Sequence, residues 1–371
     1  MNGLYRCLPP ASPDTSGFCS VMMRTDGIGV LDDPQGCVTN YISYEESDYS
    51  LETRVFASKL SDIDIIFGSQ KRLLERFQKK RKLLEPSFAV FGGGPVSSLI
   101  GTDLRAAARE CAACCGLPCC AVELNGHDAY DVGVSKTLLA LGKLFLETRG
   151  EPVPGSVNLL GVNALDLGER TVRALPGYVT AHGTPVLAAW GGFATADQMR
   201  RAARAQRNLV LTVSGLPLAA WMEEILGIPY TVWMPSAVPD TVPLRRERVL
   251  ILGEQLSSNR LRAILKSRFG FRDVRVACLF TMDERYRQPD DLQPEGEDGL
   301  AALFHSGAFD LCICDPVFFP LVPARLPTLG LPHLAVSGKL YAEQAPLLTE
   351  NELIRWLREA LLKVNLPGGK L

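Results

Sequence analysis

The feature that most constrains the fold is an alternation of short apolar runs with helical stretches, which begins at Phe88 and continues through most of the remaining chain. Apolar runs that are bounded by turn residues and separated by amphipathic stretches are typical of parallel sheets covered by helices. The pattern predicts an α/β protein with Rossmann-like parallel-sheet domains and an irregular N-terminal segment rich in Cys, Gly and Pro. The predicted strands cover residues 88–91, 119–122, 157–162, 186–189, 209–213, 249–252, 274–280 and 309–315.

The length of the chain and the placement of its prolines indicate how it divides. At 371 residues it is too long for one ordinary core. Pro235, Pro239 and Pro243 fall close together, which suits an extended connector better than the interior of a helix or strand. We predict an N-terminal cysteine-loop segment that packs on the α/β domains, an α/β region with a Rossmann-like fold, and a C-terminal Rossmann-like domain that includes a helix capped by Gly270. These parts cover residues 1–87, 88–240 and 241–371.

Composition and charge exclude several classes of protein. The 39 basic and 41 acidic residues leave a net charge of −2, so no overall field would attract nucleic acid or an anionic membrane. The basic run Lys79–Lys82 follows an amphipathic stretch and is interpreted as the solvated end of a helix. Neither a signal-like start nor a membrane-length apolar run is present, so we expect a cytoplasmic protein. Its 11 cysteines are then reduced, and serve as core residues or metal ligands.

Three cysteines stand apart because they lie outside the apolar periodic stretches. Cys7, Cys19 and Cys37 occur in a segment rich in Gly and Pro, where free backbone N–H groups could hydrogen-bond the sulfurs of a cluster. On residue types alone, a metal cluster and three incidental cysteines are equally open interpretations. The other cysteines fall in or beside predicted helices and strands and are interpreted as structural: Cys111, Cys114, Cys115, Cys119, Cys120, Cys278, Cys312 and Cys314. A soft-metal site at Cys111, Cys114 and Cys115 is a less favoured alternative.

Four blocks of the sequence resemble the nitrogenase component 1 type oxidoreductase family. The stretch Cys7–Gly17 (CLPPASPDTSG) is similar to the first cysteine loop of that family, and Asp33–Cys37 (DPQGC) resembles its second, Gly-Cys motif. Gly94–Asp103 (GPVSSLIGTD) resembles the strand-to-helix segment that ends in Ile-Gly-Asp-Asp, and Val55–Leu73 resembles the stretch before that strand. The order and approximate spacing agree over most of the chain, and the C-terminal third agrees in pattern more than in motif.

The resemblance implies a cluster-binding subunit that works as a homodimer or with a related component 1-like subunit, and that receives electrons from an ATP-dependent iron-sulfur reductase. One departure matters, because Gly94 stands where the family usually has its third cysteine. Each subunit then offers two family-equivalent ligands, Cys7 and Cys37, with Cys19 as an unassigned thiol. A [4Fe-4S] cluster usually needs four thiolates, which two subunits together could supply. Loss of the cluster is the alternative. The resemblance also assigns the turns at Gly36 and Gly94 to the cofactor region.

Polar residues follow several predicted strands, at the place where open α/β sheets bind ligands. The candidates for cofactor binding or for facing an inter-domain cleft are Asn125, His127, Asn163, Asp166, Gly253, Glu254 and His333. For each histidine, stabilisation of a turn is the competing interpretation, because one sequence does not show which residues meet in space. The sequence identifies no catalytic residue.

Motifs for nucleotide binding and for hydrolysis are absent from the sequence. It has no Walker A, His-Glu-x-x-His or Gly-x-Ser-x-Gly pattern, and Gly92-Gly93-Gly94 lacks the glycine order of a dinucleotide site. We therefore expect an oxidoreductase subunit that reduces a substrate or metallocofactor with electrons from a separate ATP-dependent reductase. A non-catalytic scaffold for metallocofactor assembly and a cluster-free small-ligand binding protein are the alternatives.

Anaerobically purified protein, alone or with its partner subunit, is expected to show oxygen-sensitive iron-sulfur absorbance that Cys7→Ser or Cys37→Ser abolishes, because these thiols are the predicted ligands. Absorbance spectroscopy with iron and sulfide analysis measures the effect. Cys114→Ser is the control, and should alter stability at most. Iron-free protein from both preparations would contradict the cluster hypothesis.

Overall fold

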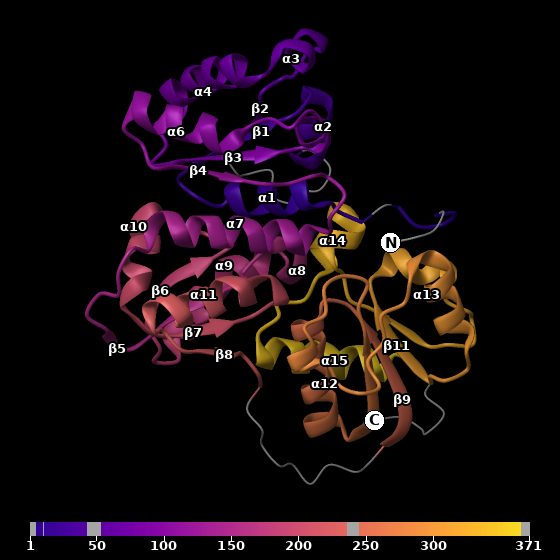
Figure 1. Ribbon diagram of the computed structural model, residues 1–371. Coiled ribbons are helices and arrows are strands. Elements are labelled where there is room, and N and C mark those ends of the chain that lie inside the picture. The colour runs from indigo at the N-terminus through magenta and orange to yellow at the C-terminus, as the bar shows by residue number, and fades with distance from the viewer. Residues whose placement is uncertain (1–4, 10, 43–52, 236–244, 365–371) are drawn as a thin grey trace.

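The computed structural model describes residues 5–9, 11–42, 53–235 and 245–364. Its strands form three parallel sheets of four strands each, with helices packed on them (Figure 1). The α/β prediction is therefore confirmed, and every predicted apolar run overlaps an observed strand. The predicted proline connector lies, from residue 236 on, outside the described residues.

The first sheet has the strand order β2-β1-β3-β4 and combines segments from both sides of residue 88. All residues of β1 and β3 are buried, because these two central strands are covered on both faces. Helices and strands already occur within the first 50 residues, although the sequence there has little apolar periodicity and predicts an irregular segment. The strands are β1 (Ile28–Asp32), β2 (Val55–Ala57), β3 (Ala89–Gly93) and β4 (Cys119–Val122), and the helices are α1 (Asp14–Met22), α2 (Gln35–Asn40), α3 (Asp62–Phe67), α4 (Gln70–Leu84), α5 (Pro95–Ile100) and α6 (Leu104–Cys115).

The second sheet has the strand order β6-β5-β7-β8. Its strands are β5 (Val153–Leu160), β6 (Val186–Trp190), β7 (Ala205–Val210) and β8 (Tyr230–Val232). The helices of this part of the chain are α7 (Tyr130–Phe145), α8 (Ala164–Leu167), α9 (Glu169–Ala181), α10 (Ala196–Arg201) and α11 (Leu216–Leu226). Helix α7 faces the first sheet as well as the second (Figure 1).

The third sheet has the order β10-β9-β11-β12. Helix α12 ends at Phe269, and Gly270 follows it with φ 75°, so the predicted helix cap is confirmed. None of the helices in the described part of the chain combines the length and apolar composition that a bilayer crossing needs. The strands are β9 (Arg245–Leu252), β10 (Phe271–Ala277), β11 (Leu311–Cys314) and β12 (Thr328–Gly330), and the helices are α12 (Gln255–Phe269), α13 (Gly296–His305), α14 (Leu334–Ser337) and α15 (Glu350–Leu362).

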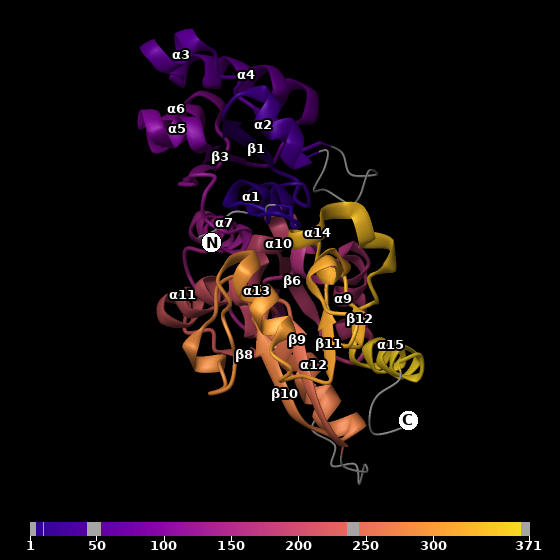
Figure 2. The ribbon, with the colours of Figure 1, turned by 90° about the vertical axis from the view of Figure 1, so that its right-hand side faces the viewer.

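Helices α1 and α7 form the joint between the first and second sheets (Figures 1 and 2). All residues of α1 are buried. At Gly17 an added Cβ would lie 2.1 Å from the carbonyl oxygen of Tyr130, and at Gly133 it would lie 1.9 Å from that of Asp14. The two helices therefore touch backbone to backbone, and only glycine fits at these two positions. The joint also fixes the place of Tyr130, the first residue of α7.

Gly133→Ala is expected to lower the free energy of unfolding by about 1–3 kcal/mol, because the added methyl group would overpack this contact. The matched control is Gly177→Ala on α9, where no atom lies within 4 Å of the added Cβ. The control should leave stability unchanged or raise it by up to about 1 kcal/mol, since alanine favours a helix. Urea denaturation followed by circular dichroism measures both. Equal losses in the two variants would contradict the packing analysis.

Candidate functional site

The three N-terminal cysteines lie on separate elements. Cys7 is exposed, and its backbone N–H donates to Glu297 at 2.9 Å, so the first cysteine loop is fastened to the first turn of α13. Cys37 is exposed in α2, where no atom lies within 4 Å of a Cβ added to Gly36. Cys19 is buried in α1. In the described ranges, no group of three His, Cys, Asp or Glu side chains is placed to hold a metal ion.

A four-thiolate cluster therefore does not fit the residues of one chain. All eleven cysteines are free, and Gly94 caps the N-terminus of α5. The predicted structural cysteines are buried in β11 and at Cys278 and Cys111, but Cys115, Cys119 and Cys120 are only half-buried, and Cys114 is exposed on α6, so the interpretation is wrong for Cys114. For Cys119 and Cys120 the reason is that β4 is an edge strand, covered less completely than the central strands. Burial still raises the pKa of the Cys119 and Cys120 thiols to about 12, which makes them poor thiolate ligands near neutral pH.

The predicted candidates Asn125 and His127 lie in the loop after β4, away from the pocket described next. The backbone N–H groups of Asn125 and Gly126 each donate to the Asp14 carboxylate at 2.8 Å. The side-chain oxygen of Asn125 accepts from the backbone N–H of His127 at 2.7 Å. His127 itself is exposed. Asn125 thus shapes a turn that fastens α1, a local structural role.

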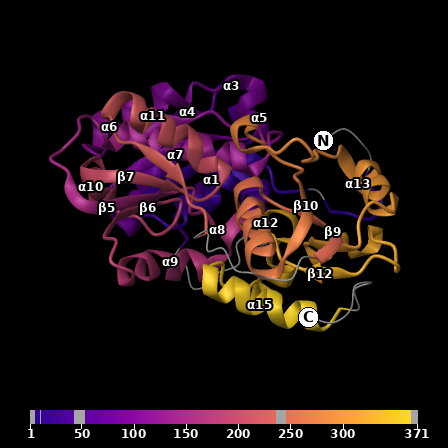
Figure 3. The same cartoon turned by 90° about the horizontal axis from the view of Figure 1, so that it is seen from below.

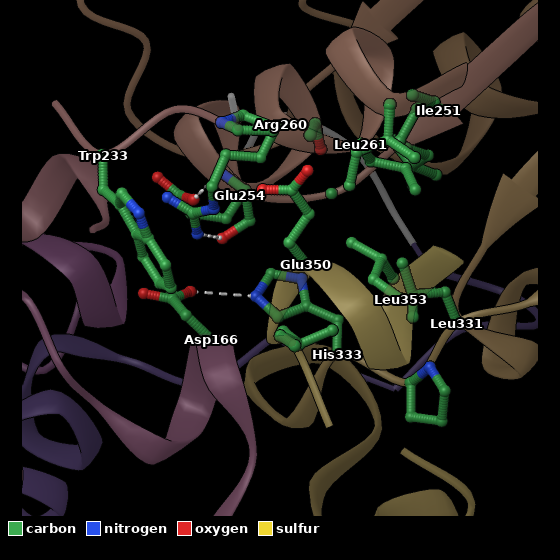
Figure 4. Close-up of a pocket in the computed structure, with 18 residues that line it drawn as sticks. Asp166, Trp233, Ile251, Glu254, Arg260, Leu261, Leu331, His333, Glu350 and Leu353 are labelled. Atoms are coloured by element: carbon green, nitrogen blue, oxygen red, sulfur yellow. Dashed lines mark hydrogen bonds and ion pairs between the residues drawn. The ribbon is translucent and has the colours of Figure 1, made fainter. Parts of the chain in front are cut away.

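The second and third sheets lie side by side (Figure 3). A pocket lies between them, at the carboxyl ends of their strands (Figure 4). Its cavity volume is about 60 Å³, within about 760 Å³ of space between the lining atoms that includes open solvent. Asp166 enters from the segment after β5 and His333 from the loop after β12, while Gly253 and Glu254 follow β9. The fold thus brings four of the candidate residues to one place. The apolar wall of the pocket includes Trp233, Ile251, Leu261, Ile264, Leu331 and Leu353.

A buried triad of Asp166, His333 and Tyr130 lies beside this pocket, which Asp166 and His333 line while Tyr130 lies behind them. His333 Nε2 lies 3.1 Å from Asp166 Oδ1 (Figure 4) and 3.1 Å from the Tyr130 hydroxyl oxygen. The Tyr130 hydroxyl donates to Asp166 Oδ1 as well. Asn163 supports the same carboxylate, because its side-chain amide donates to Asp166 Oδ2 at 2.6 Å. Sequence reasoning missed Tyr130, because a tyrosine at the start of a helix carries no distinguishing pattern.

Asp166 controls the protonation of its two neighbours. Burial alone would lower the pKa of His333, but the hydrogen bond to Asp166 and the charge of that carboxylate outweigh it, and the pKa of His333 is raised. Burial raises the pKa of Tyr130 well above its ordinary value, and the charge of Asp166 adds to this effect. The triad therefore favours a neutral Tyr130 and a His333 that holds its proton to a higher pH than a free imidazole.

Glu254 and Arg260 place a second set of buried charges at the N-terminus of α12. The Glu254 carboxylate accepts from the backbone N–H groups of Val213 at 2.8 Å and Ser257 at 2.7 Å. Arg260 donates to the Leu211 carbonyl oxygen at 2.6 Å. Burial raises the pKa of Glu254 and lowers that of Arg260. Since protein atoms already satisfy these charges, they give the pocket its shape and its polarity.

Comparison with known proteins identifies relatives of this chain. The family model for nitrogenase component 1 type oxidoreductases matches residues 24–242. The nitrogenase iron-molybdenum cofactor biosynthesis protein NifE of Methanococcus maripaludis is 25% identical over 255 residues, which are 67% of this chain and 52% of that protein. NifE of Nostoc is 28% identical over 183 residues, 47% of this chain and 37% of that protein. The chain thus spans about half the length or less of these relatives.

One further relative is named for a different complex. The CfbD component of the Ni-sirohydrochlorin a,c-diamide reductive cyclase complex of Methanothermobacter thermautotrophicus is 25% identical over 125 residues, 34% of this chain and 33% of that protein. Among solved structures, nitrogenase Cp1 at pH 6.5 superposes with a TM-score of 0.72 and 12% identity, covering 100% of this chain and 97% of that one. Nitrogenase Cp1 at pH 5 gives 0.71 and 15%, covering 97% and 89%. These structural matches establish a shared fold.

The His333–Asp166 contact predicts a pH-dependent contribution to stability. Because the pKa of His333 is raised on folding, the contribution is fully present below the unfolded value, about 6.5, and is lost as the pH rises through the folded pKa. The loss of stability in His333→Gln should therefore be larger at about pH 6 than at about pH 8. Urea denaturation at a series of pH values measures it. In an Asp166→Asn background this pH dependence should be lost or reversed, because burial lowers the pKa of His333 once the charge of Asp166 is removed, and an unchanged pH dependence there would contradict the assignment.

Proposed function

Because the chain belongs to the nitrogenase component 1 type oxidoreductase family, we propose that it is the ligand-holding subunit of a reductive complex. It accepts electrons from a separate ATP-dependent iron-sulfur reductase and directs them to a ligand in the pocket around Asp166 and His333. One observation carries the proposal: an exposed apolar face beside the first sheet is separate from a buried pocket between the other two sheets. A subunit whose reductant is another protein needs both features, one for docking and one for the ligand.

The docking face is the α3 patch, which consists of Ile63, Ile66 and Phe67. These side chains are 67%, 73% and 83% exposed. Their spacing of three and four residues places them on one side of the helix. Large apolar side chains that gather on a surface mark sites of contact with other proteins. In Figures 1 and 2 this helix lies at the end of the molecule opposite the third sheet, where a partner can approach.

The segment that carries the α3 patch is fastened to the same strand end as the second cysteine motif. Ser69, just after α3, donates to Asp32 Oδ2 at 2.9 Å, and the backbone N–H of Leu60, just before it, donates to the Asp33 carbonyl oxygen at 3.3 Å. Cys37 follows Asp33 by four residues. A reductase on the α3 patch would therefore lie beside Cys37, which supports this end of the sheet as the point of electron entry.

The complex in this proposal contains two component 1-like subunits, either two copies of this chain or this chain and a related subunit. The thiolates that we assign to a shared [4Fe-4S] cluster are Cys7 and Cys37, with equivalent ligands from the second subunit. When bound, such a cluster stores single electrons between the reductase and the pocket. The role of this chain in the complex is to expose the two thiols and to hold the Cys7 loop in place through Glu297.

Assembly of a metallocofactor is the second candidate function, and the names of the NifE relatives favour it.

The lining of the pocket favours reduction of an organic substrate instead. No cysteine is among the described residues that line it, and thiolate is the preferred ligand of metal–sulfur groups. Trp233 and the aliphatic wall suit an apolar body, while His333 and Asp166 can orient its polar edge and hold or release a proton there. The CfbD relative is itself named for a reductive cyclase complex.

Phe67→Asp is expected to lower electron transfer from the co-encoded reductase with MgATP by about tenfold or more, because a charge would replace an anchor of the interface. Leu83→Asp is the matched control, since Leu83 is also exposed, at 75%, but lies at the far end of α4. Stopped-flow oxidation of the reductase measures the rate. Direct chemical reduction should be unchanged in both variants. Equal rates in Phe67→Asp and Leu83→Asp would contradict docking on the α3 patch.

A further inference from the structure

A second cavity lies at the outer edge of the first sheet, where residues of α2, β2 and α4 line it. These three elements are at the end of the molecule opposite the third sheet (Figure 1). The cavity volume is about 430 Å³, which is within the range of pockets that hold small organic molecules. Its lining residues on α2 are Gln35, Val38 and Thr39, whose spacing places them on one side of that helix. Cys37 is not among the lining residues, so this cavity is separate from the thiol that we assign to the cluster.

The charge of this cavity has one sign. Four basic side chains line it, and no acidic side chain is among the described lining residues. None of the four forms an ion pair within the described ranges, although the Nζ atom of Lys80 lies 4.3 Å from the centroid of the Phe56 ring. A concave space with charges of one sign concentrates counter-ions. The cavity therefore selects an anion through its basic residues, which are Lys59, Arg76, Lys79 and Lys80.

The backbone at Lys59 provides an independent indication of a ligand site. Its φ of 61° lies in the left-handed region, and among the described non-glycine residues only Glu85, at the end of α4, shares a positive φ. This conformation costs a non-glycine residue about 1–2 kcal/mol, and such strain gathers at binding sites. The backbone N–H groups of Ser58 and Leu60, on either side, donate to carbonyl oxygens at the end of β1 and just after it, at 2.8 and 3.3 Å. The fold thus holds a strained lysine at the cavity.

The floor of the cavity is apolar. Val30, Val38, Val55 and Phe77 line it and are each 2% exposed or less. A small inorganic ion would make no use of these walls, whereas an organic body would bury its apolar surface against them. Lysine and arginine side chains bind phosphate through charge-assisted hydrogen bonds. The cavity therefore combines a surface for an apolar body with charges for a phosphate group.

We propose that this cavity is a binding site for an organic phosphate. The apolar body of the ligand lies on the floor formed by β1, β2 and α4, and its phosphate group lies among the four basic side chains. This site goes beyond the proposed function, because it includes neither the pocket around Asp166 and His333 nor the α3 patch. It requires no metal and no reductase.

Naphthyl phosphate is a suitable probe, because it joins an apolar two-ring body to one phosphate group. Isothermal titration calorimetry of the full chain at low ionic strength should show binding of this probe. Naphthol and inorganic phosphate should each bind about tenfold more weakly or worse, since each keeps only one half of the recognition. Added salt should weaken the binding of naphthyl phosphate, because it screens the charges of the site.

Two variants locate the site. Arg76→Glu should weaken the affinity for naphthyl phosphate by about tenfold or more, because it places a negative charge beside the phosphate group. Lys82→Glu is the matched control, since it makes the same change of charge on α4 but lies outside the cavity, and it should change the affinity by less than about threefold. Thr39→Trp should also weaken binding, because a large side chain would fill the cavity without a change of charge. Thermal unfolding followed by circular dichroism shows that each variant is folded.

The proposal is overturned if wild-type protein does not bind naphthyl phosphate. Equal affinity for naphthol would show an apolar cavity that does not select charge, and equal affinity for inorganic phosphate would show that the apolar floor takes no part. Equal losses in Arg76→Glu and Lys82→Glu would assign the binding to the general charge of α4, and so would also contradict the site. Electron transfer enters none of these measurements, so this proposal and the proposed function fail separately.

Discussion

The arrangement of the molecule depends on the contacts of one residue, Tyr130. Its backbone N–H donates to the Ser12 carbonyl oxygen at 3.1 Å, and its carbonyl oxygen lies against Gly17 on α1. Its hydroxyl contacts Asp166, which follows β5 of the second sheet, and His333, which follows β12 of the third sheet. A buried hydroxyl between a carboxylate and an imidazole holds its position because each partner would otherwise be left unpaired. Segments of all three sheets therefore meet at Tyr130, and the same contacts position Asp166 and His333, which line the pocket.

The two ends of the molecule differ in how their buried charges are satisfied. In the pocket, Asp166 and Glu254 accept hydrogen bonds from several protein groups, so this site is organised before any ligand binds. At the edge of the first sheet, Asp33 is 1% exposed, and burial raises its pKa to about 6 although the backbone N–H of Val96 offsets part of that effect. The first arrangement suits recognition of a ligand with modest polarity, whereas the second leaves a buried carboxylate that is more readily protonated. This difference supports separate tasks for the two sites.

Departures from the family pattern are informative here because they occur in pairs. Gly94 alone would indicate a lost ligand, but Asp33 fills the space that the glycine leaves. Likewise, the exposed α3 patch would be a liability on an isolated monomer, but it is attached to the strand end that precedes Cys37. In both cases a second residue accounts for the first. Asp33 and Gly94 lie far apart in the sequence, and Ser69 lies 37 residues after Asp32, so neither pair is visible in a reading along the chain.

The sequence by itself determined the α/β class, the strands from Phe88 onward except the short edge strands β8 and β12, and the cap at Gly270, because apolar periodicity and a left-handed glycine are local properties. It also named Asp166, Glu254 and His333, since strand ends can be located locally. Only the tertiary structure decided that these three meet while Asn125 and His127 serve a turn. It also revealed Tyr130 as a site residue, and Asp33 as the occupant of the space at Gly94. Strand order, register and the packing of α1 on α7 arise from contacts between distant segments, and these leave no periodic trace in the chain.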